Sequence, residues 1–158
     1  MCGLARTTNG GAGADTFVFM GGDACHHGGE FRPTEYRPLP EEISPNPLDL
    51  RSSKPCPGAM FEEIHRNKEA TEPFFEIAVL EGGKGVAHDV EAATESIRRL
   101  EEFDASPDVF VAIAHDDTLL DVVDFFPKTA GAWKEKGWAK DSRWRFLKDF
   151  KKAVESHD

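Results

Sequence analysis

The sequence predicts a mixed fold (α/β or α+β) in a single domain that covers residues 1–158. Two short apolar runs, Phe17–Met20 and Val109–Ala114, are rich in aromatic and β-branched residues, as strands covered on both faces are. Between them, residues 89–103 carry apolar side chains at three- and four-residue steps, the period of an amphipathic helix. A helix that leads into a buried strand is typical of α/β proteins. A chain of 158 residues with 39% hydrophobic content suffices for one core.

The chain begins with two strands that we expect to pair as a hairpin. Cys2–Thr8 can form the first strand and Thr16–Met20 the second. Asn9–Gly13 connects them and is rich in glycine, which accepts positive φ at low cost. The hairpin would bring Asp23, just beyond the second strand, to one end of the sheet.

The middle of the chain is predicted to be largely irregular. Proline recurs between Phe31 and Pro57, which predicts an ordered loop without long regular elements, of the kind that often covers a substrate. A short helix is expected within Pro57–Asn67, with His65 near its end as a surface residue or a helix-end cation. Phe74–Leu80 is expected to be a further strand or the start of one, stopped at Glu81–Gly83.

The second half of the chain is predicted to be richer in helices. Asp89 can cap a helix that runs to about Phe103, and the strand Val109–Ala114 follows this helix in the chain. Leu119–Phe126 is expected to be a short apolar helix or a packed turn, and Asp141 to cap a last helix through about Ser156. Three tryptophans are expected in the core and not at a cofactor: Trp133, Trp138 and Trp144.

Side chains that can bind a metal follow each of the two apolar strands. These residues are Asp23, Cys25, His26 and His27 after the first strand, and His115, Asp116 and Asp117 after the second. Functional groups in α/β proteins gather at strand ends, and divalent metals accept carboxylate and imidazole together. The alternative interpretation is a capping aspartate and a hydrogen-bonded histidine at ordinary strand ends.

The residues after the first strand leave a second pair of alternatives open. His26 and His27 are adjacent, so in extended backbone they point to opposite sides and cannot easily bind one ion. Cys25 could be a reactive thiol beside a protonated histidine, although a buried and inert cysteine is the commoner case. A weak metal or redox site made from these residues and Asp23 is therefore the functional hypothesis that we rank lowest.

The two strand ends resemble motifs of the metallo-β-lactamase superfamily. Gly21-Gly22-Asp23 and Ile113-Ala114-His115-Asp116 are similar to its last two metal-ligand motifs, and the segment from Gly22 to Pro33 resembles its fungal lactonase-like members. The resemblance implies one layer of an αββα sandwich, with a mainly antiparallel or mixed sheet and helices on one face. It further implies that Asp23 bridges two metal ions, usually zinc, and that His115 completes the second site. His26, His27 and Asp116 are further candidates for ligands or for groups that support them.

The sequence also departs from the family pattern. It contains no His-x-His-x-Asp-His motif, and its first histidine is His26. The resemblance therefore implies that the sequence is truncated and corresponds to the carboxy-terminal half of a family member. Such a half would leave one sheet face open, and we expect a homodimer through that face.

Two further functional hypotheses follow from the resemblance. One is metal-dependent hydrolysis of a small lactone, ester or amide, in which water activated by zinc attacks a carbonyl group. Arg32 and Tyr36 are the candidate substrate contacts, because they lie near Asp23 in the sequence. The alternative is a non-catalytic fragment that folds or associates but turns nothing over, which the missing motif favours.

Composition narrows the classes of partner. The net charge of −10 would repel a nucleic acid backbone or an anionic membrane, so neither is expected as a partner. Three cysteines make no disulfide framework, and no run approaches the roughly 20 apolar residues of a membrane span. These features predict a cytoplasmic protein.

Overall fold

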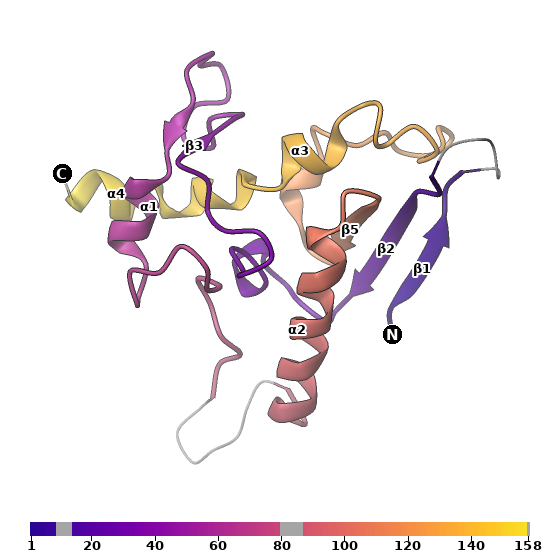
Figure 1. The fold of residues 1–158 in the computed structure, drawn as a ribbon, viewed down its shortest axis with the longest axis horizontal. Coiled ribbons are helices and arrows are strands. Elements are labelled where there is room, and N and C mark those ends of the chain that lie inside the picture. Colours follow the sequence, from indigo (N-terminus) through magenta and orange to yellow (C-terminus); the bar gives the residue numbers. More distant parts are fainter. Residues whose placement is uncertain (9–13, 80–86, 158) are drawn as a thin grey trace.

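The computed structural model describes residues 1–8, 14–79 and 87–157 of the chain. It confirms the mixed α and β class, with a three-stranded sheet and one long helix packed across it (Figure 1). The elements are, in chain order, β1 (Gly3–Arg6), β2 (Phe17–Gly22), η1 (Gly28–Glu30), β3 (Glu42–Ile43), β4 (Cys56–Pro57), α1 (Ala59–Ile64), α2 (Val90–Ala105), β5 (Val109–Ile113), η2 (Asp117–Leu119), α3 (Trp138–Ser142), η3 (Arg145–Phe150) and α4 (Lys151–His157). Among the described residues, every helix is too short or too polar to span a lipid bilayer.

The sheet is mixed and has the strand order β1-β2-β5. β1 pairs antiparallel with β2, with Ala5 opposite Val18, which confirms the predicted pairing of the first two strands. The expected connection at Asn9–Gly13 lies outside the described residues. β2 pairs parallel with β5, with Phe19 opposite Val111. Because β2 and β5 run in the same direction, the residues that follow the two strands lie side by side at the same end of the sheet.

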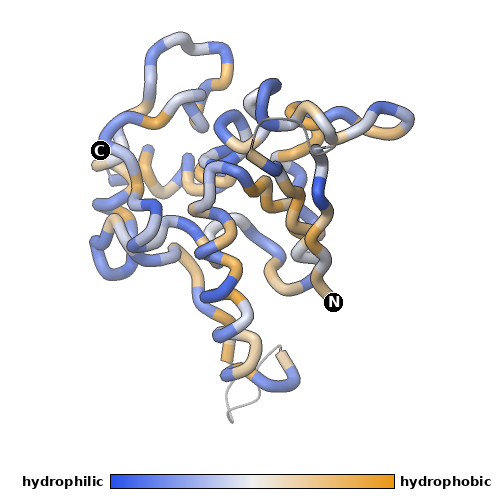
Figure 2. The backbone as a smooth tube through the Cα atoms, turned by 45° about the vertical axis from the view of Figure 1, so that its right-hand side comes forward, coloured by the Kyte–Doolittle hydropathy of each residue, from blue (hydrophilic) through white to orange (hydrophobic). Residues whose placement is uncertain are grey.

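Helix α2 packs on the sheet by one face, as its sequence period predicts. It begins where expected, because the Asp89 side chain accepts a hydrogen bond of 3.0 Å from the backbone N–H of Ala92. Ile97 and Leu100 are buried in a cluster that includes Val111 of β5. Figure 2 shows hydrophobic and hydrophilic residues alternating along this helix. Each buried aliphatic side chain contributes about 1.5–3 kcal/mol, so this face holds the helix in place.

Tryptophans cover β5 on the face opposite α2. The rings of Trp133 and Trp138 lie 5.7 Å and 5.9 Å from the ring of Phe110, measured between centroids, and all three residues are buried. Trp133 Nε1 also donates a hydrogen bond of 3.2 Å to Thr7 Oγ1, which ties this cluster to the end of β1. Trp144 is buried in a third cluster, so all three tryptophans belong to the core, as predicted.

The two edges of the sheet, at β1 and at β5, differ in how well side chains cover them. Val109, Phe110 and Val111 of β5 are buried, whereas Leu4 on β1 is 50% exposed and Met20 on β2 is 49% exposed. The sheet is therefore less well covered on the β1 side than at β5. The homodimer through an exposed sheet face stays a prediction.

The proline-rich segment is irregular, as expected, but it is anchored to the core. Within Phe31–Pro57, the only strands are the two-residue strands β3 and β4. Ile43 and Phe61 are fully buried against Leu147 of the carboxy-terminal segment. This third cluster fixes the loop against α1, η3 and α4.

Two expected elements differ in the described residues. Residues 74–78 form no strand, because Phe74 and Phe75 donate their backbone N–H groups to Arg32 and Gly29 in the neighbouring loop. The expected end of this strand and its glycine stop lie outside the described residues.

The expected single helix at Asp141–Ser156 is divided into α3, η3 and α4. Trp144, Phe146 and Leu147 are all buried, and residues two positions apart cannot share one face of an α-helix. The tighter 3₁₀ turn of η3 brings these side chains into one core.

His65 lies at the end of α1, as expected, but it is buried and is not a surface residue. It is 3% exposed at the carboxyl end of α1, and its Nδ1 accepts hydrogen bonds from the backbone N–H groups of Asn67 and Glu69. Its Nε2 lies 3.1 Å from the carbonyl oxygen of Pro73. The ring therefore satisfies a tight turn that the sequence pattern does not reveal.

Candidate metal centre

The candidate site lies where β2 and β5 end side by side. The backbone N–H of Ala114 donates a 2.9 Å hydrogen bond to the carbonyl oxygen of Gly22, which holds the two strand ends together. Gly22 has φ +55°, and a Cβ there would lie 3.0 Å from the carbonyl oxygen of Met1. Glycine is therefore needed at the turn that leads from β2 into Asp23.

Three side chains meet beside these joined ends of β2 and β5. His115 Nε2 lies 3.4 Å from Asp23 Oδ1, and His26 Nε2 lies 3.8 Å from the same oxygen. The rings of His26 and His115 are stacked, with centroids 5.4 Å apart. One potential ligand atom from each of the three residues lies within 4.8 Å of the other two. All three side chains are exposed, so a ligand can reach them from solvent.

This geometry fits a divalent metal ion. Two bonds of 2.0–2.1 Å at a tetrahedral angle place neighbouring zinc ligands about 3.3 Å apart. The observed separations of 3.4 Å and 3.8 Å from Asp23 Oδ1 approach that value, and all three ligand atoms lie within 4.8 Å of one another. Two imidazoles and a carboxylate, with the fourth position open, is also a ligand set of catalytic zinc sites.

The backbone of His115 has an uncommon conformation. Its φ is +63°, in the left-handed region that residues other than glycine seldom occupy. Such a conformation costs on the order of 1–3 kcal/mol and often accompanies a functional role. It turns the His115 side chain toward Asp23 directly after β5.

The turn that carries His26 is fixed by its neighbours. The backbone N–H of His26 donates to Glu30 Oε2 at 3.1 Å, and that of Ala24 donates to the carbonyl oxygen of Gly21 at 3.2 Å. Between them, Cys25 is fully buried in the cluster under α2. Burial, together with the charge of Glu30, raises the pKa of the Cys25 thiol to about 12. Cys25 is thus the inert, buried cysteine, and the redox site is not supported.

His27 points away from the site, as expected for the neighbour of His26. Its Nδ1 accepts a hydrogen bond of 3.0 Å from the backbone N–H of Gly29, and its Nε2 lies 3.1 Å from Asp149 Oδ2. Its ring packs edge-on against Phe75 and Phe146. His27 thus caps η1 and does not join the candidate ligands.

Asp116 is occupied by a local role. Its Oδ1 accepts hydrogen bonds from the backbone N–H and the hydroxyl of Thr118, so it caps η2. Asp116 lies outside the group that Asp23, His26 and His115 form. The capping role was the alternative interpretation of an aspartate at this strand end.

Arg32 and Tyr36 lie away from the candidate site. Arg32 is 6% exposed, and its guanidinium group is paired with Asp104 at 2.6 Å, on the last turn of α2. That turn precedes the beginning of β5, whereas His115 follows its end. Arg32 was expected to contact substrate, but its guanidinium group is instead occupied by a buried ion pair. Tyr36 is exposed at the same distant end, where Glu102 and Glu35 raise its pKa.

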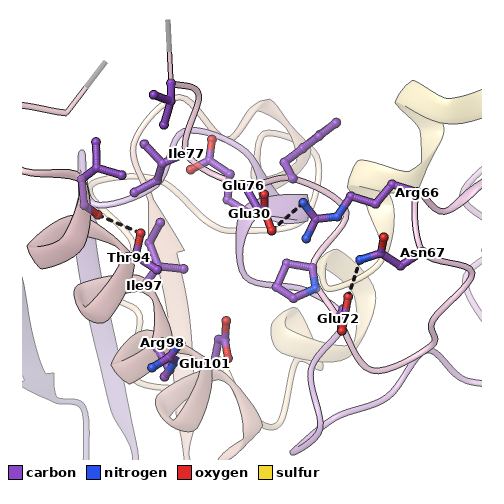
Figure 3. Close-up of a pocket in the computed structure, with 14 residues that line it drawn as sticks. Glu30, Arg66, Asn67, Glu72, Glu76, Ile77, Thr94, Ile97, Arg98 and Glu101 are labelled. Atoms are coloured by element: carbon purple, nitrogen blue, oxygen red, sulfur yellow. Dashed lines mark hydrogen bonds and ion pairs between the residues drawn. The ribbon is translucent and has the colours of Figure 1, made fainter. Parts of the chain in front are cut away.

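Two adjoining cavities open beside the candidate site. One, of about 770 Å³, is lined by Asp23 and His26. The other, of about 510 Å³, lies between the segment at residues 72–79 and α2, where Arg66 is paired with Glu76 (Figure 3). Both cavities are lined by Glu30, Phe75, Glu76 and Ile77. The sequence did not single out these four residues, because no local pattern shows that the folded chain brings them together.

Comparison with known proteins gives relatives but no family model and no solved structure that matches. The chain is 44% identical over 150 residues to a gamma-lactamase of Fusarium pseudograminearum, and 40% identical over 158 residues to a metallo-hydrolase of Annulohypoxylon moriforme. These matches cover 95% and 100% of this chain but 35% and 39% of the relatives. A gamma-lactamase of Gibberella moniliformis is 51% identical over 76 residues, which is 48% of this chain and 30% of that protein.

The chain spans little more than a third of the length of the first two relatives. The chain is therefore similar to fungal proteins named gamma-lactamase and metallo-hydrolase, in agreement with the resemblance to the metallo-β-lactamase superfamily.

Proposed function

We propose that this chain provides a zinc centre for the hydrolysis of a small lactam, lactone or related ester or amide. The observation that carries the proposal is the convergence of Asp23, His26 and His115 at the joined ends of β2 and β5. The names of the relatives support it, since two are gamma-lactamases and one is a metallo-hydrolase.

In this proposal the three side chains hold the ion. Asp23 is the central ligand, because both imidazoles lie against its Oδ1. When bound, zinc polarises a carbonyl group as a Lewis acid and lowers the pKa of water from about 15.7 to about 7. The described residues bring together ligands for one ion, and the two-metal arrangement implied by the resemblance stays a prediction.

Other residues of the chain would shape the site for substrate. Glu30 fixes the turn that presents His26, and Phe75 and Ile77 supply apolar surface to the cavity beside it. Apolar walls exclude water and favour a small ligand with a limited polar part. The net charge of −10 disfavours polyanions, so we propose a small molecule and no nucleic acid or anionic membrane as the partner.

The test is zinc content followed by hydrolysis. Protein purified in chelator-free buffer with added zinc is analysed for metal, and its turnover of a simple γ-lactam and a simple γ-lactone is measured. We expect about one zinc per chain, which Asp23→Asn abolishes together with any turnover. Asp149→Asn is the matched control, because Asp149 contacts His27 on the far side of the same turn. Failure of the wild-type chain to bind zinc would overturn the proposal and leave the non-catalytic alternative.

A further inference from the structure

A buried cluster of charges lies at the end of the molecule opposite the candidate metal centre. Asp104 is 4% exposed and accepts two hydrogen bonds from the fork of Arg32, at 2.6 Å and 2.9 Å. Arg143 is 7% exposed and donates from Nη1 to the carboxylate and the carbonyl oxygen of Asp104. Arg37 approaches from the proline-rich loop and donates 2.6 Å from Nη2 to the carbonyl oxygen of Ala105.

The positive charges in this cluster exceed the negative ones. Three guanidinium groups surround one carboxylate, and among the described residues Asp104 is the only ion-pair partner that they have. Arg37 Nε is buried and makes no hydrogen bond within the described chain. A buried donor without a partner costs about 1–3 kcal/mol. The three guanidinium groups thus carry two positive charges more than Asp104 balances, in a protein whose net charge is −10.

The ionisation of the cluster agrees with this imbalance. Burial, reinforced by the charges of Arg32 and Arg37, lowers the pKa of Arg143 to about 10 although Asp104 opposes the change. Burial alone would raise the pKa of Asp104, but Arg32 and Arg143 hold it below its usual value. Both oxygens of the Asp104 carboxylate therefore accept hydrogen bonds from Arg32 or Arg143. A further negative charge would be stabilised beside Arg143 and Arg37.

A cavity of about 340 Å³ opens on the side of this cluster that faces solvent. Arg37 and Arg143 line it, and Lys140 of α3 adds a third cation at its rim. Ser44 offers a hydroxyl, and Glu42, which is exposed, is the one acidic residue among the described lining residues. Neither Glu42 nor Lys140 forms an ion pair with another described residue.

We propose that this cavity binds a small oxyanion, a phosphate or carboxylate group, held by Arg37, Lys140 and Arg143. The planar guanidinium group matches two oxygens of such an anion, and charge-assisted hydrogen bonds are about twice as strong as neutral ones. The volume admits one small group and not an extended polyanion. The bound anion supplies the counter-ion that Asp104 alone does not provide.

This site is independent of the proposed metal centre. The cavity borders Pro107, which precedes β5, whereas Asp23 and His115 lie beyond the opposite ends of β2 and β5. A strand of five residues spans about 16 Å, so the two sites do not share a ligand. Binding of an anion here accordingly does not require zinc or hydrolytic activity.

The experiment measures anion binding by calorimetric titration and by the thermal unfolding midpoint of the intact chain. Inorganic phosphate and acetate are the two probes, and sodium chloride at equal ionic strength is the reference. We expect saturable binding of at least one probe, with an unfolding midpoint that rises with its concentration. Lys140→Gln should weaken that binding about tenfold, as expected for the loss of one charged hydrogen bond.

Matched variants decide whether the cavity is responsible. Lys152→Gln removes an exposed lysine from α4 that forms no ion pair among the described residues, and it should leave anion binding unchanged. Asp23→Asn should also leave it unchanged, which separates this site from the metal centre. Arg37→Gln, which removes no partner of Asp104, should abolish binding. Stabilisation by chloride equal to that by the probes, or equal losses in Lys140→Gln and Lys152→Gln, would overturn the proposal.

Discussion

The imidazole rings of His26 and His115 stack at 5.4 Å with an angle of 18° between their planes. The two residues follow different strands, and both side chains are more than half exposed, so burial does not explain their approach. An aromatic pair of this kind contributes only about 0.5–1.5 kcal/mol. Both Nε2 atoms face Oδ1 of Asp23, which is the arrangement that the proposed metal ion would use.

The adjacent histidines give a direct test of this arrangement. His26→Ala should lower zinc affinity by at least about tenfold, because loss of a group that only supports a ligand already costs about 10- to 100-fold. His27→Ala should leave zinc affinity unchanged, since His27 faces Asp149 and not Asp23. Competition with a chromophoric chelator measures both affinities. Equal losses in the two variants would show that His26 is not a ligand.

The buried cluster around Asp104 predicts a large loss of stability. Asp104→Asn leaves the guanidinium groups of Arg32 and Arg143 buried without a counter-ion, which should cost about 3–5 kcal/mol of unfolding free energy. Asp108→Asn is the matched control, because Asp108 pairs with Lys134 near the surface and such pairs contribute at most about 1 kcal/mol. Denaturant unfolding measures both changes, and similar small losses would contradict the assigned role of Asp104.

Local patterns predict the three strands of the main sheet, the start of α2 and the strand-end residues Asp23 and His115. Each of these depends on short runs of sequence: an apolar stretch, a capping aspartate, a glycine turn. The third candidate ligand, His26, follows from the turn after β2, which the resemblance covers. These features are encoded within a few residues, so they can be read without the fold.

Features that depend on distant partners could not be predicted in this way. Arg32 lies close to Asp23 in sequence, yet its partner Asp104 comes from the end of α2 and takes it out of the site. The division of the last helix likewise depends on burying Trp144 and Phe146 together in a core built partly by the proline-rich loop. Sequence distance to a candidate site is therefore a poor guide to its lining residues.

Thiol reactivity should separate the three cysteines. Cys2 is exposed, whereas Cys25 and Cys56 are buried, and burial raises the pKa of both buried thiols. One thiol should react rapidly with a disulfide reagent in the folded protein, and all three in denaturant. Because the thiolate is the reactive form, Cys25 should be the slowest. Rapid modification of Cys25 in folded protein, located by mass spectrometry, would contradict its place in the core.

Self-association should depend on the β1 side of the sheet. β1 is an edge strand of the described sheet, and its Leu4 is half exposed. Exposed strand edges pair with other chains unless charges block them, so Leu4→Lys should shift a dimer toward monomer. Thr94→Lys on the exposed face of α2 is the control. Sedimentation velocity over a range of concentrations measures the effect, and a wild-type monomer throughout would contradict the expected homodimer.

The carboxyl group of Glu101 predicts that stability falls as the pH rises. Burial at the wall of the cavity of about 510 Å³, with Arg98 opposing and the charge of Glu35 adding to it, raises its pKa from 4.5 to about 7. Between these two values the folded protein holds a proton that the unfolded chain releases, so this group favours folding at low pH. That contribution is lost as the pH rises through about 7.

Glu101→Gln should therefore remove the part of the pH dependence that Glu101 causes. One unit of pKa corresponds to about 1.4 kcal/mol, and solvent screening reduces the effect for a half-buried group, so we expect a gain of about 1 kcal/mol above neutral pH. Below the lower pKa the variant and the wild type should have similar unfolding free energies, because the glutamate is then neutral in both states. Glu102→Gln, at the exposed neighbouring position, should leave the slope unchanged. Parallel stability profiles of wild type and Glu101→Gln between pH 4.5 and about 7 would show that Glu101 titrates as an ordinary surface carboxylate.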